Sequence, residues 1–245
     1  SNCCFAGVFE GNGYTITALK TSGTDNYAGL FAYNKGTIRN LTVSGNITGG
    51  RNYAGILCAW NEGTIEYCCS TGTINSDVTR GGLLGYNTDK GVVSESSSQA
   101  VVKGDGAAAG GLVGHSSGII RYSHASGNVS GSNGVGGLVG SAQWGEVSDS
   151  YASGNVSGNS GYLGGLVGDM YYGNIRGCYA RGSVNGGNGC GLVGRLESGG
   201  IKYSYYNSAN TGNKKGFAET IARLKRQETY YGWDFAHIWK MGGDG

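Results

Sequence analysis

Proline is absent from this chain of 245 residues, and the four charged residue types together make up only 14% of it. Proline interrupts the hydrogen bonding of central strands, so its absence suits a chain built largely of strands. The formal net charge of +2 gives no basis for binding nucleic acid or an anionic membrane. No apolar run approaches the ~18 residues of a membrane-spanning helix, so this segment is not expected to span a membrane.

Glycine is abundant, with 51 residues, but the chain is not of low complexity because its apolar residues recur in columns. A glycine stands directly before two apolar residues at Gly7, Gly29, Gly55, Gly82, Gly111, Gly137, Gly165 and Gly191. Spacings of 22 to 29 residues are typical of a stacked repeat architecture. Residues 6–9 (AGVF) match residues 28–31 (AGLF), so we expect the array to continue before residue 1.

The repeats have the pattern of strands. Residues 68–74 alternate small or apolar side chains with polar ones, which indicates a strand with one buried face. One repeat cannot bury its own apolar side, whereas equivalent strands of successive repeats, stacked ~4.8 Å apart, can. The sequence therefore predicts an all-β fold, a right-handed parallel β-helix (solenoid) of about eight coils over residues 1–208, with about three strands per coil and a single axial core.

Residues 209–245 do not follow the period and are predicted to form a C-terminal cap. Phe217, Ile221 and Leu224 recur at helical spacing within residues 217–227, and Trp233 and Trp239 follow. A repeat stack exposes apolar surface and unpaired strands at its ends, which a short helix and an aromatic tail would cover.

The seven cysteines follow no regular framework, and none has the spacing of a zinc site. Cys3-Cys4 and Cys68-Cys69 are adjacent in sequence, which suits neither chelation nor ordinary disulfides. Cys68 and Cys178 occupy a column that is otherwise Leu or Ser, so the cysteines are interpreted as small core residues. The three histidines form no H-E-x-x-H motif. The sequence therefore predicts no cofactor and no metal site.

Two outward columns carry acidic or basic side chains. One contains His115, Ser141, Asp169 and Arg195, and the other contains Glu95, Tyr122, Asp149 and Gly177. Stacking separates the candidate acids and bases by about two coils, or ~10 Å. The two carboxylates of a glycosidase lie ~5–9.5 Å apart. Both columns are therefore interpreted as solvated surface, with a polysaccharide lyase or hydrolase kept as the enzymatic alternative.

A third outward column is aromatic over four consecutive repeats, at His124, Tyr151, Tyr179 and Tyr205. Stacked rings brace a solenoid, and they can also form a flat strip that binds glycan or a partner protein. These four residues are the predicted candidates for ligand or partner binding, and the sequence leaves both interpretations open.

The repeats resemble the GLUG-motif family, named for its Gly-Leu-apolar-Gly core. The similarity is close at residues 111–114, 137–140, 165–168 and 191–194, which all read GLVG. The resemblance implies a secreted or surface-attached bacterial protein, such as an adhesin-like protein or the non-catalytic part of an IgA-specific metallopeptidase. It implies no catalytic residues.

We therefore expect a non-catalytic extracellular or cell-surface β-helix module, which serves as a rigid stalk or adhesive surface of a larger bacterial protein. Its expected partner is a glycan or a host or cell-surface protein. The alternatives are a substrate-positioning, non-catalytic region of a secreted peptidase and a carbohydrate-active β-helix enzyme. The sequence leaves the ligand and the oligomeric state open.

Overall fold

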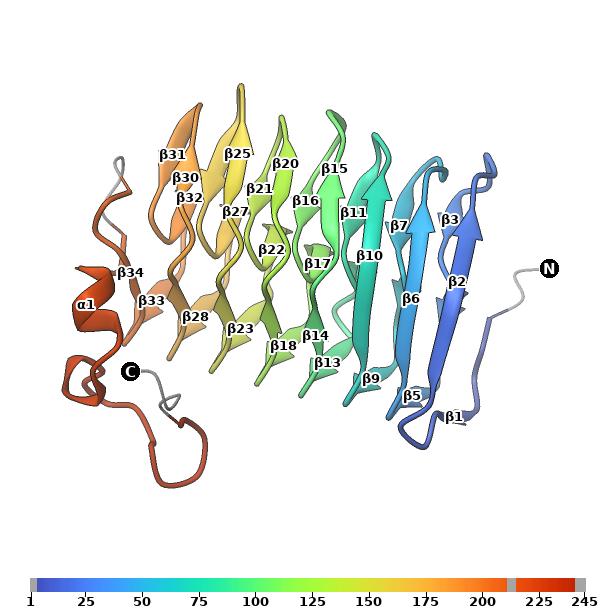
Figure 1. The fold of residues 1–245 in the computed structure, drawn as a ribbon, viewed down its shortest axis with the longest axis horizontal. Helices are drawn as coiled ribbons and strands as arrows, with labels where there is room; N and C mark the ends of the chain where they lie inside the picture. Colours follow the sequence, from blue (N-terminus) through green and yellow to red (C-terminus); the bar gives the residue numbers. More distant parts are fainter. Residues whose placement is uncertain (1–3, 211–214, 241–245) are drawn as a thin grey trace.

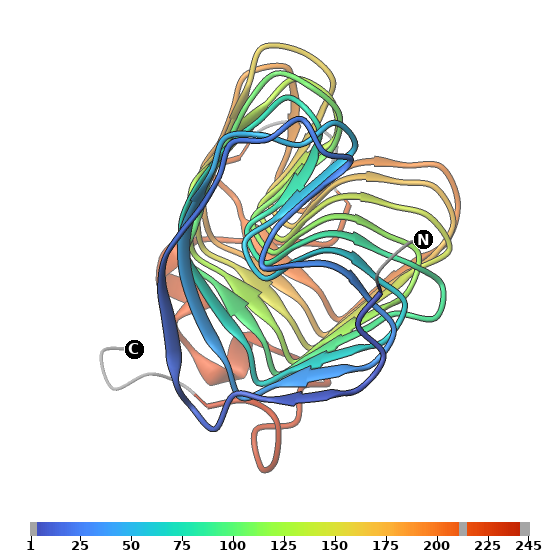
Figure 2. The same ribbon diagram turned by 90° about the vertical axis from the view of Figure 1, so that its right-hand side faces the viewer.

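The chain is a parallel β-solenoid of about seven turns, followed by a short C-terminal region that holds both helical segments of the described residues (Figure 1). This computed structural model describes residues 4–210 and 215–240, so Cys3 and parts of the predicted cap lie outside the described residues. Seen from the N-terminal end in Figure 2, the chain runs clockwise as it recedes from the viewer, which makes the solenoid right-handed. The predicted fold class is confirmed.

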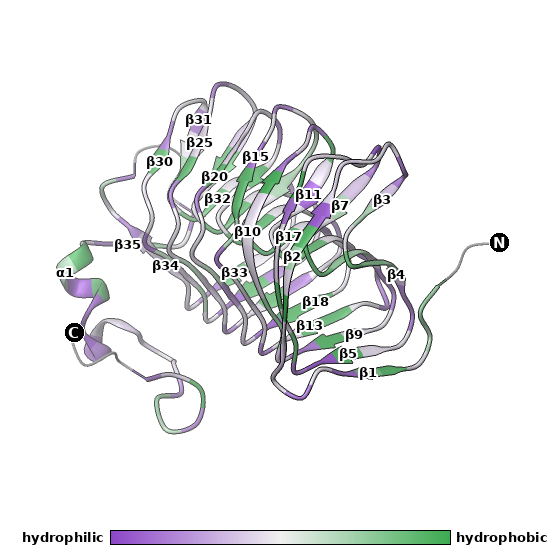
Figure 3. Ribbon diagram, turned by 45° about the vertical axis from the view of Figure 1, so that its right-hand side comes forward, coloured by the Kyte–Doolittle hydropathy of each residue, from purple (hydrophilic) through white to green (hydrophobic). Residues whose placement is uncertain are grey.

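Each turn contributes to four sheets, one more than the three strands per coil predicted. The base sheet has eight strands: β1 (Val8–Glu10), β5 (Thr37–Arg39), β9 (Thr64–Glu66), β13 (Val92–Ser94), β18 (Ile119–Arg121), β23 (Glu146–Ser148), β28 (Asn174–Arg176) and β33 (Gly200–Lys202). The inner sheet has seven: β3 (Tyr27–Ala28), β7 (Tyr53–Gly55), β11 (Thr79–Gly81), β16 (Ala109–Gly110), β21 (Val135–Gly136), β26 (Tyr162–Gly164) and β31 (Asn188–Cys190). Hydropathy colouring shows apolar positions recurring on successive base-sheet strands (Figure 3).

The flank sheet also has seven strands: β4 (Phe31–Asn34), β8 (Cys58–Asn61), β12 (Leu84–Asn87), β17 (Val113–Ser116), β22 (Val139–Ala142), β27 (Val167–Met170) and β32 (Val193–Leu196). The long sheet begins with β2 (Thr15–Thr21), β6 (Thr42–Ile47) and β10 (Cys69–Asn75). In later turns it divides into two short strands per turn: β14 (Ser97–Ser98), β15 (Val101–Lys103), β19 (His124–Ala125), β20 (Val129–Gly131), β24 (Tyr151–Ala152), β25 (Val156–Gly158), β29 (Tyr179–Ala180) and β30 (Val184–Asn185). It ends with β34 (Tyr205–Asn207) and β35 (Phe217–Glu219).

Pairing between turns corrects the alignment of the first repeats. Phe9 pairs with Ile38 in the base sheet, although the match of AGVF to AGLF placed it beside Phe31. Phe31 pairs instead with Cys58, because the second turn has one residue fewer between its inner and flank strands. Among the described residues the first predicted coil contributes strands only to the base and long sheets, which is why there are about seven turns and not eight.

The interior contains two apolar cores where one was predicted. The larger core includes Ile38, Leu138 and Val147, and lies among the base, flank and long sheets. A smaller core, which includes Val129, Val135 and Leu163, lies between the later long-sheet strands and the inner sheet. The inner sheet folds back into the solenoid and separates the two lobes, as the end-on view shows (Figure 2).

Glycines make the narrow waist between the lobes possible. A Cβ on Gly140 would lie 2.6 Å from the Ala109 nitrogen and 2.6 Å from the Gly114 carbonyl oxygen, both backbone atoms. A Cβ on Gly137 would lie 2.8 Å from the Cβ of Ala152 in the long sheet. The glycines that flank each Leu-Val pair are therefore required by close approach between sheets.

Serines form a ladder at the corner between the base and long sheets. The Ser123 hydroxyl accepts a hydrogen bond from the Ser96 amide, at 3.2 Å, and donates one to the Arg121 carbonyl, at 2.7 Å. Cys178 takes a place in this ladder, and its thiol donates to the Arg176 carbonyl at 3.2 Å. Burial raises the pKa of the Cys178 thiol to about 12. Among the described residues no disulfide forms, and Cys58, Cys68, Cys178 and Cys190 are buried.

The residue before each ladder position turns the corner with a left-handed backbone. This position is occupied by Asn40, Tyr67, Glu95, Tyr122, Asp149, Gly177 and Tyr203, with φ between 46° and 61°. Only one of the seven is glycine, although other residue types adopt this conformation at a cost. The corner therefore holds large side chains outward in a fixed column.

The C-terminal region follows the last strand of the period, β34. Phe217 lies in β35, which pairs with β34, and the helix α1 (Ile221–Leu224) has only four residues, so the predicted helix over 217–227 is wrong in extent. A single 3₁₀ turn, η1 (Gln227–Thr229), follows. The short helical and aromatic region exists as expected, whereas the division of the chain at residue 208 stays a prediction.

Candidate functional site

The predicted aromatic strip forms as a stack on the outer face of the long sheet. The ring centroids of His124 and Tyr151 lie 4.7 Å apart with planes at 2°, and those of Tyr151 and Tyr179 lie 4.8 Å apart at 5°. Tyr205 pairs with Tyr179 in the next turn. Parallel pairing in register explains the stack, because each ring sits one strand spacing from the last.

The C-terminal tail, residues 217–240, covers the later part of this strip. Tyr205 contacts Phe217 and Tyr230, and its side chain is buried. Tyr179 contacts Trp233 and Tyr230 at centroid distances of 5.9 and 6.2 Å. The indole of Trp233 also donates a hydrogen bond of 2.7 Å to the Tyr203 carbonyl. Tyr179 and Tyr205 therefore anchor the tail, and only the earlier rings remain open.

The open end of the strip lines a cleft of about 510 Å³. We call this the corner cleft; it is lined by Glu95, Tyr122, Ser123, His124, Asp149, Tyr151, His237, Ile238 and Trp239. Three parts of the chain meet there: the left-handed corner column, the aromatic strip and the tail. The Trp239 ring lies 6.4 Å from that of Tyr151 and 5.9 Å from that of Tyr179.

Burial governs the charge of the corner cleft. It lowers the pKa of His124, so the imidazole is neutral at pH 7, and it raises the pKa of Asp149. Asp234 accepts a hydrogen bond from His237, which lowers the pKa of that carboxyl. The lining contains two carboxylates and no Lys or Arg. Such a cleft offers the edges of stacked rings and hydrogen-bonding groups without a cationic patch.

The other outward column places its groups differently. Arg195 donates two hydrogen bonds of 2.7 Å to Asp169, and its guanidinium lies 4.3 and 4.4 Å from the ring centroids of Tyr162 and Tyr171. Ser141 lies between His115 and Asp169 in the register, and no hydrogen bond joins it to either among the described residues. Because a nucleophilic triad needs its base between the serine and the acid, this order does not form one.

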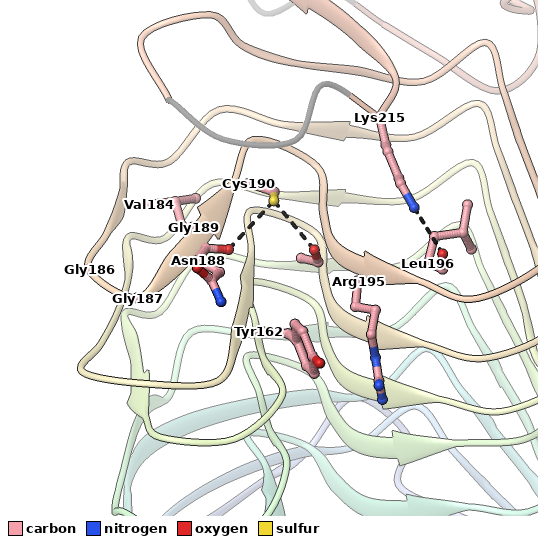
Figure 4. Close-up of a pocket in the computed structure, with 11 residues that line it drawn as sticks. Tyr162, Val184, Gly186, Gly187, Asn188, Gly189, Cys190, Arg195, Leu196 and Lys215 are labelled. Atoms are coloured by element: carbon pink, nitrogen blue, oxygen red, sulfur yellow. Dashed lines mark hydrogen bonds between the residues drawn. The ribbon is translucent and has the colours of Figure 1, made fainter.

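Arg195 and Tyr162 stand at one side of a hollow of about 660 Å³ near the C-terminal end of the inner and flank sheets (Figure 4). Lys215 donates a hydrogen bond of 2.9 Å to the Leu196 carbonyl there. Arg195 already pairs with Asp169 and contacts two rings, so its side chain links neighbouring turns. We therefore interpret this hollow as part of the structural contact between turns and not as a binding site.

Two features of the outer surface were missed from the sequence. Tyr53, Trp60 and Tyr86 form a ring cluster where the inner and flank sheets meet, with centroids 4.5 to 5.2 Å apart. Trp144 and Tyr172 stack at 4.3 Å on the turns that lead into the base sheet. The aromatic residues were visible in the sequence, but the folding back of the inner sheet was not.

Within residues 4–210 and 215–240, no helix has the length and apolar character of a membrane span. In the same residues, no three His, Cys, Asp or Glu side chains are grouped as a metal site.

The fold and repeated glycine waist define a β-solenoid repeat protein. The GLUG motif profile matches three consecutive segments, residues 105–130, 131–157 and 159–185. The GLUG motif is therefore present in this stretch of the chain, as the sequence indicated. A stretch of 97 residues, 38% of the chain, is 38% identical to halomucin of Haloquadratum walsbyi (strain DSM 16790 / HBSQ001). The match spans 1% of halomucin's length.

Proposed function

We propose that this chain is a rigid, non-catalytic adhesive module of a larger secreted or cell-surface protein, and that it binds glycan in the corner cleft. His124 and Tyr151 contact the ligand, while Tyr179 and Tyr205 hold the tail that completes the cleft. The peptidase-associated and enzymatic alternatives remain outcomes of the tests.

The observation that carries the proposal is a cleft in which the partly exposed edges of two stacked rings, His124 and Tyr151, lie beside carboxylate, imidazole and hydroxyl groups. Sugars present apolar faces and many hydroxyl groups, and binding sites for small molecules combine apolar walls with a few placed polar groups. The GLUG repeats, and a partial match to a protein named for mucins, support an extracellular setting. A stack of repeats whose strands pair in register from turn to turn supports the role of a rigid spacer.

The test is a glycan array probed with the whole chain and with Tyr151→Ser. Wild type should bind a set of glycans, and Tyr151→Ser should lose them while keeping its melting temperature within a few degrees. Tyr14→Ser is the matched control, because Tyr14 is 74% exposed and lies outside the corner cleft. Absence of glycan binding by the wild-type chain would refute the proposal, and turnover of a bound glycan would refute its non-catalytic part.

A further inference from the structure

Trp144 is an unusual residue for the surface of this solenoid. Its side chain is 67% exposed, and its backbone has a φ of 64°, in the left-handed region. The neighbouring Tyr172 is 41% exposed, and the two rings lie 4.3 Å apart at 14°. Large exposed rings and left-handed non-glycine residues both carry a cost, and such features cluster at functional sites.

A bracing role explains this pair poorly. Rings that stabilise a solenoid gain most when they are buried against neighbours, as Tyr205 is. The equivalent turns of neighbouring repeats manage without rings, with Ser116-Ser117-Gly118 before this pair and Glu197-Ser198-Gly199 after it. Glycine at position 144 would also adopt the left-handed backbone without strain, so the shape of the turn does not require the indole.

Position relates the Trp144–Tyr172 pair to the corner cleft. Trp144 lies two residues before β23, and Asp149 of the corner cleft lies directly after it. Five residue steps span at most about 17 Å when the chain is fully extended, so the two sites lie within that distance along the backbone. Tyr172 stands in the same place before β28, which pairs with β23 through Glu146↔Asn174 and Ser148↔Arg176. The outer face of these two strands therefore connects the ring pair to the corner cleft.

The polar groups along this path favour an uncharged ligand. Glu146 and Arg176 carry opposite charges, and the exposed Asn174, which pairs with Glu146, adds a hydrogen-bonding group beside them. The corner cleft has no Lys or Arg to bind carboxylates or sulfates. A neutral sugar chain satisfies these groups with its hydroxyls and stacks an apolar ring face on an exposed indole.

We propose that Trp144 and Tyr172 form a second stacking platform, and that a neutral oligosaccharide runs from it across β23 and β28 into the corner cleft. This inference rests on the proposed glycan binding and extends it to a site of several sugar units. The platform binds the distal unit of a longer chain, so it adds affinity only when the chain is long enough to reach it.

The experiment measures calorimetric affinities for cello- and chito-oligosaccharides from disaccharide to hexasaccharide. For the wild-type chain, affinity should rise with length. Trp144→Gly should bind the hexasaccharide roughly tenfold more weakly, the loss typical of an aromatic anchor, and the disaccharide unchanged. Its melting temperature should hold or rise, because glycine accepts the left-handed backbone. Tyr172→Ser should reproduce the loss of chain-length dependence.

Tyr67→Gly is the matched control, because Tyr67 is 57% exposed, has a φ of 53° and makes no ring contact among the described residues. It should bind every oligosaccharide like the wild type. Unchanged hexasaccharide affinity in Trp144→Gly would overturn the platform and leave the proposed function standing. A lowered melting temperature in Trp144→Gly would establish bracing instead. The platform and the proposed function would both be refuted if the wild-type chain bound no glycan on the array or in solution, or if it bound only a protein.

Discussion

Replacing Gly140 with alanine tests the waist that shapes this solenoid. The added methyl group would lie 2.6 Å from two backbone atoms, the Ala109 nitrogen and the Gly114 oxygen. Neither belongs to a side chain that can rotate away, so the inner and flank sheets must separate. Separation of these sheets would loosen the packing between the two cores in more than one turn.

Overpacking of a well-packed interior typically costs 1–3 kcal/mol, and the upper end, about 3 kcal/mol, applies where backbone must move. For a chain of this size each kcal/mol corresponds to roughly 2–4 °C in melting temperature. Gly140→Ala should therefore melt roughly 6–12 °C below the wild type.

The assay is thermal unfolding followed by far-ultraviolet circular dichroism, with Gly7→Ala as the control. A Cβ on Gly7 would meet nothing closer than 3.7 Å, so this variant should melt like the wild type or slightly above it. If Gly140→Ala and Gly7→Ala gave the same melting temperature, the waist would not be a rigid backbone contact and the two-core interior would be wrong.

Three further perturbations test the core, the corner and the titrating groups. Leu138→Asp places an unpaired charge in the larger core and should lower the free energy of unfolding by more than about 4 kcal/mol, so that a protease cleaves several turns. An unchanged protease pattern would place Leu138 outside the core. Ser123→Ala leaves the Ser96 amide without its acceptor and should cost about 1–3 kcal/mol in urea unfolding, whereas Cys178→Ser keeps the ladder and should cost under about 1 kcal/mol. Burial lowers the pKa of His115 and His124, so below pH ~6.5 the unfolded chain binds more protons than the folded chain. Stability should therefore fall as the pH drops from about 7 to about 5. A variant with both histidines replaced by Gln should show a melting temperature that depends less on pH.

The parallel stacking was predictable because a single repeat has no other way to bury its apolar face. The columns of Ile38, Ile65 and Ile120 lie in register as expected, each fully buried. The first repeat was misaligned because four letters, AGVF, match two different places in a turn. The pairing between strands distinguishes these two places, but a match of four letters carries no information about pairing.

The two-lobed interior was harder to predict than the stacking. In the sequence, the glycine before each apolar pair served only to define the repeat, whereas Gly137 and Gly140 mark places where sheets nearly touch. The number of glycines was the available signal, because a turn needs one glycine of this kind and each repeat has up to three beside its Leu-Val pair. Sheet contact depends on what lies a full turn away, so spacing alone does not reveal it.

The candidate site was predictable in part for the same reason. His124, Tyr151, Tyr179 and Tyr205 share a register position, and the repeat brings them together. The tail that covers two of them has no period, and Trp239 carries no sequence signal for the turn on which it packs. Only the arrangement of the tail distinguishes the rings that anchor it from the rings that stay open.

Function in such a chain is encoded where a turn departs from its neighbours. The core columns, the glycine waist and the serine ladder recur because every turn must satisfy the same stacking geometry, so these residues carry no information about a ligand. Aromatic residues stand at this position only in the two turns that carry Trp144 and Tyr172, and Trp144 lies in an exposed and strained setting that stacking does not require. The same strand that follows it leads to the open rings of the corner cleft. That coincidence of two departures on one strand is the reason to seek the ligand on the face of β23 before any other surface.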